Sequence, residues 1–189
     1  MASFRVVYDA SVLYPAPLRD FLMELALSNL FAARWTEEIH DEWIRNVLKN
    51  RPDLTLERLT RTKNLMNAKV EGCLVTGYEV KIPELQLPDM DDCHVLAAAI
   101  HCDASYIVTF NLRDFRDTDL TPYGVQALHP DKFILHLLEL DSMAVCQAAQ
   151  RQRSRLKNPP KAVKEYLETL QQQGLTLTAM RLREVCQEI

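Results

Sequence analysis

Residues 91–110 read DDCHVLAAAIHCDASYIVTF, and this stretch predicts a helix followed by a buried strand. The three alanines at 97–99 allow the helix to pack closely against a neighbour, and the apolar run SYIVTF is typical of a strand that is covered on both faces. Asp91 and Asp92 stand at the start of the helix, where Asp is a common capping residue. The stretch therefore predicts one helix–strand unit of a layered fold.

The same alternation of strands and helices occurs earlier in the chain. Phe4–Tyr8 (FRVVY) is a short apolar run, residues 18–30 carry apolar side chains at helical spacing, and Phe31–Trp35 is a second apolar run. Thr36 then caps a predicted helix, TEEIHDEWIRNVLKN, whose early acids complement the helix dipole. The segment IPELQLP (82–88) is expected to be an extended connector. This alternation predicts an α/β fold of three layers (α/β/α), with a central parallel sheet between helices.

A last strand and a group of helices follow in the C-terminal part. GVQALH (124–129) predicts the strand, and PDKFILHLLEL (130–140) predicts a helix with Pro at its start. We expect residues 1–140 to form the α/β domain and residues 141–189 to form a helical C-terminal extension. The extension contains three predicted helices: Ser142–Leu156, Pro160–Gln173 and Thr176–Gln187.

Composition indicates one domain with an appendage. A chain of 189 residues is long enough for one well-buried core, since a domain typically holds about 100–150 residues. No apolar stretch approaches the roughly 20 residues of a membrane span, and the N-terminus lacks a signal-peptide pattern, so we expect a cytoplasmic protein without a membrane partner. The five cysteines show no C-x-x-C spacing, and we interpret them as reduced structural thiols.

Charge is distributed unevenly along the chain. Residues 1–140 contain 14 Lys and Arg against 21 Asp and Glu, a net charge of −7, whereas residues 141–189 contain 8 against 5, a net charge of +3. The acidic part is consistent with a metal site. The basic part can contact nucleic-acid phosphates or an acidic protein, although a solvated helical face carries a similar charge.

Four acidic positions, at the ends of predicted strands or on nearby helices, suggest a metal site. These positions are Asp9, Glu42, Asp92 and Asp114. In a parallel sheet the active crevice lies outside the carboxyl ends of the strands, so we expect the four side chains to converge there. Gathered carboxylates disfavour one another's ionised form unless a cation balances them, and an oxygen-rich site suits Mg²⁺ or Mn²⁺. The predicted chemistry is in-line hydrolysis of a phosphodiester.

Each acidic position also has a structural interpretation. Asp9 can simply end a strand, and Glu42 can be one more surface acid of an acid-rich helix. Any of Asp89, Asp91 and Asp92 can cap the helix that they open, so spacing alone does not choose the ligand among them.

Polar residues beside the strand ends are candidates for supporting roles. Asn111 and Asp114 compete for the fourth place in the site, since either side chain can hold a metal-bound water. The hydroxyls of Ser11 and Thr109 can orient a carboxylate, a water or a phosphate, or can serve a turn or cap. The histidines show no ligand spacing and are interpreted as structural or surface residues: His40, His94, His101, His129 and His136.

Four segments together resemble the signature segments of PIN-domain proteins, specifically the VapC-like toxins of bacterial type II toxin–antitoxin systems. The resemblance covers roughly residues 4–140. The segments are, in order, VVYDASVLYPAPLRD (6–20), RWTEEIHDEWIRNVL (34–48), DMDDCHVLAAAI (89–100) and IVTFNLRDF (107–115).

This resemblance implies a metal-dependent ribonuclease with a PIN-like fold. The family's acids fall on Asp9, Glu42 and Asp92, and its last position falls on the stretch from Asn111 to Asp114. Asn111 stands where many relatives have an aspartate, which leaves open whether one or two metal ions bind. The resemblance also implies an RNA substrate, a cognate antitoxin protein that blocks the acidic site, and a homodimer.

Two other classes of function compete with a nuclease for this sequence. A phosphoryl-accepting receiver or phosphatase-like domain also gathers acids at strand ends, but Asp9-Ala10-Ser11 lacks the second aspartate of a D-x-D motif. The alternative that remains is a non-catalytic PIN-fold module that binds RNA or protein. Retention of Asp9, Glu42 and Asp92 favours catalysis over that alternative.

Overall fold

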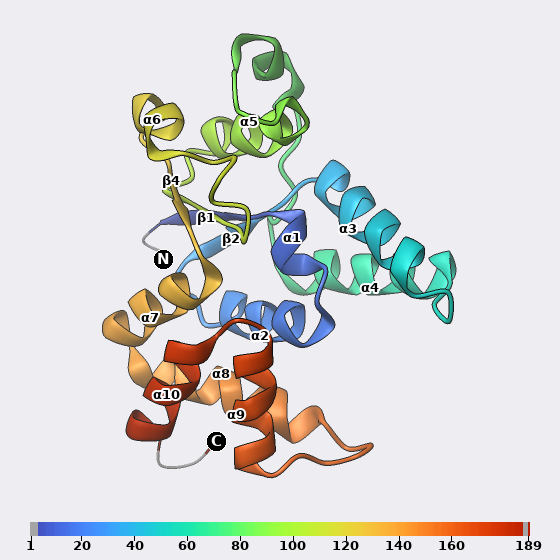
Figure 1. Cartoon of the computed structure of the whole chain (residues 1–189), viewed down its shortest axis with the longest axis vertical. Coiled ribbons are helices and arrows are strands. Elements are labelled where there is room, and N and C mark those ends of the chain that lie inside the picture. Colours follow the sequence, from blue (N-terminus) through green and yellow to red (C-terminus); the bar gives the residue numbers. More distant parts are fainter. Residues whose placement is uncertain (1–3, 187–188) are drawn as a thin grey trace.

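The computed structural model describes residues 4–186 and residue 189, with a four-stranded sheet at its centre (Figure 1). The strands run in the order β2-β1-β3-β4, and every pairing is parallel. Val6 at the centre of the sheet pairs with Ala33 on one side and with Tyr106 on the other. The predicted parallel sheet is therefore confirmed. Its strands are β1 (Arg5–Tyr8), β2 (Ala32–Arg34), β3 (Tyr106–Val108) and β4 (Gln126–Leu128).

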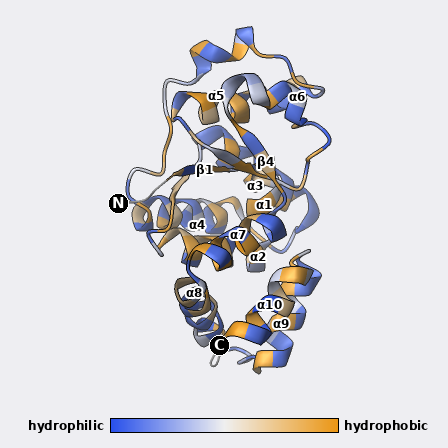
Figure 2. Cartoon of the chain, turned by 90° about the vertical axis from the view of Figure 1, so that its left-hand side faces the viewer, coloured by the Kyte–Doolittle hydropathy of each residue, from blue (hydrophilic) through white to orange (hydrophobic). Residues whose placement is uncertain are grey.

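Helices cover both faces of the sheet, which confirms the predicted three layers. In Figure 1, α5 (Cys93–His101) and α6 (Asp117–Leu120) lie above the sheet, and α2 (Ala16–Ala26) and α7 (Pro130–Leu140) lie below it. Figure 2 shows the same layers from the side. The alanines at 97–99 are fully buried, so α5 packs closely as its small side chains predict.

The other helices of the domain surround these layers. Thr36 caps α3 as predicted, since its hydroxyl oxygen accepts a hydrogen bond from the N–H of Ile39 at 3.0 Å. The connector at 82–88 is not wholly extended, because a 3₁₀ helix, η1, runs from Glu79 to Glu84. Pro83 fits inside η1, since its fixed φ is close to helical values. No helix within residues 4–186 is long and apolar enough to cross a membrane. The remaining bounds are α1 (Ala10–Leu13), α3 (Glu37–Asn50), α4 (Leu56–Lys69), η2 (Met90–Asp92) and η3 (Thr121–Tyr123).

Aromatic rings fix β1 against the helices. Tyr8 stacks on Trp35 with ring centroids 6.2 Å apart, and Phe31 contacts Phe133 edge-on at 5.1 Å. All four rings are almost completely buried, and each such ring removes about 150–250 Å² from water. The hydroxyl of Tyr8 donates to the carbonyl of Leu22 at 3.2 Å, which ties β1 to α2. This packing fixes the end of β1, where Asp9 follows.

The C-terminal helices pack on the side of α2 and α7 that faces away from the sheet (Figure 1). Buried Glu24 on α2 accepts a hydrogen bond from Arg151 Nε at 3.0 Å and also pairs with Arg155. Gln152 donates to the carbonyl of Pro17 at 2.8 Å. The division at residue 140 remains a prediction, and Gln187, predicted to end the last helix, lies outside the described residues. These helices are α8 (Ser142–Arg155), α9 (Val163–Gln172) and α10 (Thr176–Val185).

The interpretation of all five cysteines as reduced thiols was wrong for two of them. Cys146 on α8 and Cys186 after α10 form a disulfide across a sequence separation of 40 residues. The sequence did not reveal this pair because α10 brings Cys186 back to α8 only through the tertiary fold. Cys73, Cys93 and Cys102 are free.

Candidate metal centre

The candidate site lies at the carboxyl-terminal edge of the sheet, where neighbouring strands β1 and β3 end. Asp9 directly follows β1 and Thr109 directly follows β3. The backbone N–H of Asp9 donates to the carbonyl of Val108 at 3.1 Å, so the parallel pairing continues to the site. The loop after Thr109 carries Asn111 and Asp114. The topology thus places two of the predicted acids at adjacent strand ends.

Two hydroxyl groups hold the buried carboxylate of Asp9. Its Oδ2 accepts hydrogen bonds from Ser11 Oγ at 2.6 Å and from Thr109 Oγ1 at 2.8 Å. Thr109 Oγ1 in turn accepts a hydrogen bond from the N–H of Asn111 at 2.9 Å, and Ser11 Oγ accepts one from the N–H of Phe110 at 3.1 Å. The loop after β3 is therefore tied to Asp9 through both hydroxyls.

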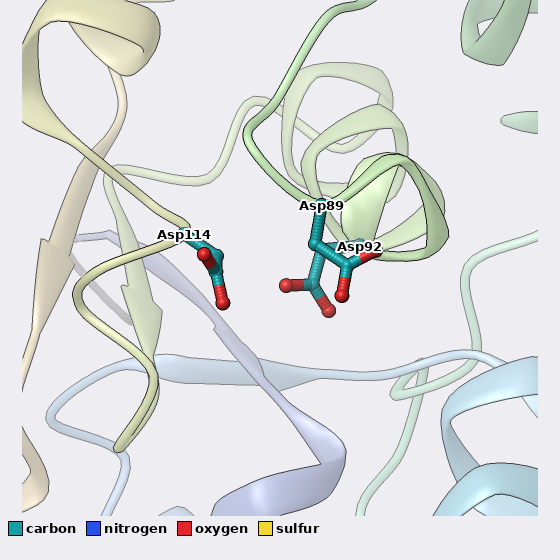
Figure 3. Close-up of side chains that lie close together, drawn as sticks. All are labelled: Asp89, Asp92 and Asp114. Atoms are coloured by element: carbon teal, nitrogen blue, oxygen red, sulfur yellow. The ribbon is translucent and has the colours of Figure 1, made fainter.

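Three aspartates face one another beside this loop. Asp89, Asp92 and Asp114 each offer a carboxylate oxygen, and these oxygens all lie within 4.8 Å of one another. Figure 3 shows Asp89 and Asp92 pointing from the start of the α5 region toward Asp114 on the opposite loop. Asn111 Nδ2 donates to Asp92 Oδ2 at 3.1 Å. Of the three acids that spacing could not separate, Asp91 stays exposed outside this cluster.

Electrostatic repulsion connects the predicted acids. The pKa of Asp92 is raised to about 7, first by partial burial and then by the like charge of four neighbouring carboxylates. Burial and, to a smaller extent, the charge of Glu42 raise the pKa of Asp9, against the opposing effect of its two hydroxyl partners. All four predicted acids therefore meet in one region, although Asp9 and Glu42 lie outside the tight cluster of three. The neighbours that act on Asp92 are Asp9, Asp89, Glu42 and Asp114.

One histidine that was interpreted as a structural or surface residue, His94, also lies in the site. His94 Nε2 is 3.5 Å from Glu42 Oε2, and His94 Nδ1 is 3.7 Å from Glu38 Oε2. The hydroxyl of Tyr78 donates to the same oxygen of Glu38 at 3.0 Å. Burial lowers the pKa of His94, but the two glutamates outweigh burial and the pKa is raised. The sequence offered one signal for this role of His94: it lies two residues after Asp92, in the first turn of the helix that the acids precede.

A cleft beside the cluster gives access from solvent. Arg45, one turn after Glu42, is the only Lys or Arg in the described lining of the cleft, and it makes no hydrogen bond or ion pair within the described part of the chain. A more apolar cavity between α2, α4 and α8 lies away from the strand ends and contains no comparable cluster. The acid-lined cleft is therefore the candidate site. Its carboxylates are Glu38, Asp41, Glu42, Asp89, Asp91 and Asp92.

The donor set fits a hard divalent cation. The facing carboxylates of Asp89, Asp92 and Asp114 supply oxygen ligands, which Mg²⁺ and Mn²⁺ prefer. Burial and then the repulsion of neighbouring carboxylates raise the pKa of Asp92, and a bound cation offsets this kind of electrostatic cost. The chemistry of the site thus agrees with the ion expected from the sequence.

Two known protein families match parts of the chain. The family described as "PIN domain" matches residues 5–113, which is more than half of the chain. This protein therefore belongs to the PIN-domain family. A second family, described as "VapC50 C-terminal domain", matches residues 130–184 and supports the VapC-like character expected from the sequence.

One curated relative shares the VapC50 name of the second family. The chain is 55% identical over 49 residues to "Putative ribonuclease VapC50" of Mycobacterium tuberculosis (strain ATCC 25618 / H37Rv). The match covers 26% of this chain and 29% of that protein, so the chain spans less than a third of the relative that it matches. No solved structure gives a significant match.

Proposed function

We propose that this protein is a Mg²⁺- or Mn²⁺-dependent endoribonuclease and the toxin of a VapC-type toxin–antitoxin system. The observation that carries the proposal is a group of mutually repelling carboxylates at the strand ends of a PIN fold. The name of the partial relative supports RNA as the substrate. We further propose a cognate antitoxin, a homodimer and a cytoplasmic location, which follow from the resemblance of the sequence segments to VapC-like toxins.

Carboxylates from separate segments form the proposed metal site. A divalent ion there would lower the pKa of an attacking water and offset charge on the scissile phosphate. Asp92 and Asp114 face one another directly, and Asp89 joins them as a further candidate ligand. Asp9 and Glu42 complete the site from β1 and α3. The proposed catalytic and metal-binding residues are Asp9, Glu42, Asp92 and Asp114.

Supporting side chains fix the orientation of these acids. Ser11 and Thr109 donate to the same oxygen of Asp9, which restricts rotation of its carboxylate. Asn111, in the loop after β3, donates a hydrogen bond to Asp92. A neutral amide, and not a further carboxylate, therefore lies next to Asp92 at this position. Such partners restrict the geometry of a site before a ligand arrives.

Arg45 is the proposed contact for the RNA backbone. Arg45 is exposed in the described lining of the cleft, where six of the other residues are acids. A phosphate that enters beside these acids is repelled, and a guanidinium group offsets that repulsion with hydrogen bonds that match phosphate geometry. We therefore assign Arg45 to binding of the substrate rather than of the metal.

RNA cleavage after induced expression tests the proposal. Wild-type protein should arrest growth and cleave RNA in vitro with Mg²⁺ or Mn²⁺, whereas EDTA or Asp9→Asn should abolish cleavage. Glu57→Gln, at an exposed position in the first turn of α4, is the matched control and should cleave normally. Folded wild-type protein that is harmless and inactive on broad RNA pools with metal supplied would instead support a non-catalytic module.

A further inference from the structure

The turn between α9 and α10 contacts the loop that carries the candidate site. Gly174 lies in this turn with a φ of +81°, and a Cβ atom placed on it would lie 3.3 Å from Phe110 Cε1. Such a distance is tighter than ordinary van der Waals contact, so any side chain at this position would crowd the ring of Phe110. A residue of the helical extension therefore meets the residue between Thr109 and Asn111.

The ring of Phe110 is held from a second side. It contacts the imidazole ring of His129 edge-on, with ring centroids 5.1 Å apart. His129 caps α7, since its Nδ1 accepts a hydrogen bond from the N–H of Asp131 at 3.1 Å. Phe110 is thus seated between the start of α7 and the turn at Gly174.

Hydrogen bonds fix the position of that turn relative to α7. The carboxylate of buried Asp131 accepts hydrogen bonds from the N–H groups of Leu177 at 3.0 Å and Thr178 at 2.8 Å, in the first turn of α10. Leu175, directly after Gly174, is fully buried. The start of α10 therefore cannot shift without breaking buried contacts with α7.

The backbone of Phe110 connects the packing of its ring to the carboxylate of Asp9. Its N–H donates to Ser11 Oγ, and Ser11 Oγ donates to Asp9 Oδ2. On either side of Phe110, Thr109 donates to Asp9 and Asn111 donates to Asp92. A displacement of the Phe110 ring would therefore move the groups that orient two of the acids.

We propose that the α9–α10 turn is a positioning element of the active site, with Gly174 and His129 seating Phe110 so that the 109–111 loop orients Asp9 and Asp92. The inference rests on the proposed function only for its effect on metal binding. It gives the C-terminal extension a role in the site, although the extension supplies none of the proposed ligands.

A pair of glycine substitutions in the full chain tests the proposal. Gly174→Ala and Gly124→Ala introduce the same side chain at similar positive φ values, +81° and +68°, but only the Cβ at Gly174 meets another residue within 4 Å. Amide hydrogen exchange of Phe110, followed by NMR without metal, should be faster in Gly174→Ala than in Gly124→Ala. Manganese affinity, measured by calorimetry, should fall about threefold more in Gly174→Ala, below the roughly 10–100-fold loss typical for direct partners of metal ligands.

Phe110→Leu provides a second test without backbone strain. This variant should by itself speed exchange of the residue 110 amide and weaken manganese binding. Adding Gly174→Ala to Phe110→Leu should cause no more loss than adding Gly124→Ala, because the ring that crowds the new Cβ is gone and His129 Cε1, at 3.8 Å, lies at an ordinary contact distance. Equal effects of the two glycine substitutions in the wild-type background, on both exchange and affinity, would overturn the proposal. Wild-type protein that binds no manganese would refute the proposed function, and the exchange comparison would still decide this inference.

Discussion

Glu24 on α2 and Asp92 at the start of α5 are both partly or wholly removed from water, yet the chain surrounds them with opposite charges. Glu24 pairs with Arg151 and Arg155, so its charge joins the helical extension to the core. Asp92 has four carboxylate neighbours, and no Lys or Arg in the described ranges forms an ion pair with it. The first arrangement stabilises the fold, whereas the second leaves negative charge for a ligand to neutralise.

Of the substitutions that compare these two regions, Asp92→Asn should have the largest effect. Asp92→Asn should reduce the rate of RNA cleavage by at least about 100-fold, since even indirect partners of metal ligands cost roughly 10–100-fold. The metal-free variant should nevertheless be slightly more stable than wild type at pH 8, because a repelled charge has been removed. Cleavage assays and thermal unfolding without metal measure the two effects. If Asp92→Asn lost stability as well as activity, Asp92 would stabilise the fold, as Glu24 does.

Neutralising Glu24 should have the opposite outcome. Glu24→Gln is expected to lower the free energy of unfolding by about 2 kcal/mol, because a buried carboxylate loses its charged contacts with two arginines. Cleavage measured well below the unfolding transition should stay close to wild type. Glu168→Gln, which alters only an exposed pair with Lys164 at 3.9 Å, is the matched control for denaturant unfolding. A cleavage defect in folded Glu24→Gln would contradict the assignment of Glu24 to stability alone.

The raised pKa of Asp92 should make the stability of the metal-free fold depend on pH. The pKa of Asp92 in the metal-free fold, about 7, is above the value of an unperturbed Asp, so the folded state holds a proton that the unfolded state has lost between about pH 4 and 7. Protonation of Asp92 therefore stabilises the folded state fully below about pH 4, and this stabilisation declines as the pH rises toward 7.

Metal binding should change with pH in the opposite direction. Because a metal ion competes with the proton on Asp92, manganese affinity should rise about tenfold from pH 6 to pH 8. Calorimetry at several pH values measures this rise. An affinity that is independent of pH would show that Asp92 is not a ligand.

The smallest effect is expected at the edge of the cleft. Arg45→Ala should weaken RNA binding a few-fold and reduce the slope of log affinity against log salt concentration by about 0.7, the contribution of one phosphate contact to a single strand. Arg61→Ala on exposed α4, outside the acid cleft, should leave the slope unchanged. Filter binding at several salt concentrations, with calcium in place of magnesium, distinguishes the two.

Local sequence patterns were sufficient to predict the layers of the fold, and they suggested where a site would lie. The apolar runs before Asp9 and Thr109 predicted β1 and β3 because strand residues buried on both faces need continuous apolar character. Thr36 predicted the start of α3 because capping depends on adjacent residues. Asp9 lies beside the loop that carries Asn111 and Asp114 because the ends of neighbouring parallel strands share one edge of the sheet.

Contacts between distant segments could not be predicted in the same way. Asp89 and Asp92 can be distinguished from Asp91 as candidate ligands only because the fold places Asp114 opposite the first two. His94 joins the site because α3 brings Glu38 and Glu42 toward it, and Cys146 meets Cys186 only after α10 returns to α8. No local pattern records such pairings, since each depends on how whole elements pack.

Manganese titration of the metal-free protein by calorimetry, on wild type and on Asp92→Asn at pH 8, tests the central claim most directly. If the uncompensated carboxylates form a metal centre, wild-type protein binds Mn²⁺ saturably and the substitution removes or strongly weakens binding, while Glu57→Gln binds as wild type does. Absence of binding to folded wild-type protein, or unchanged binding in Asp92→Asn, would contradict the account.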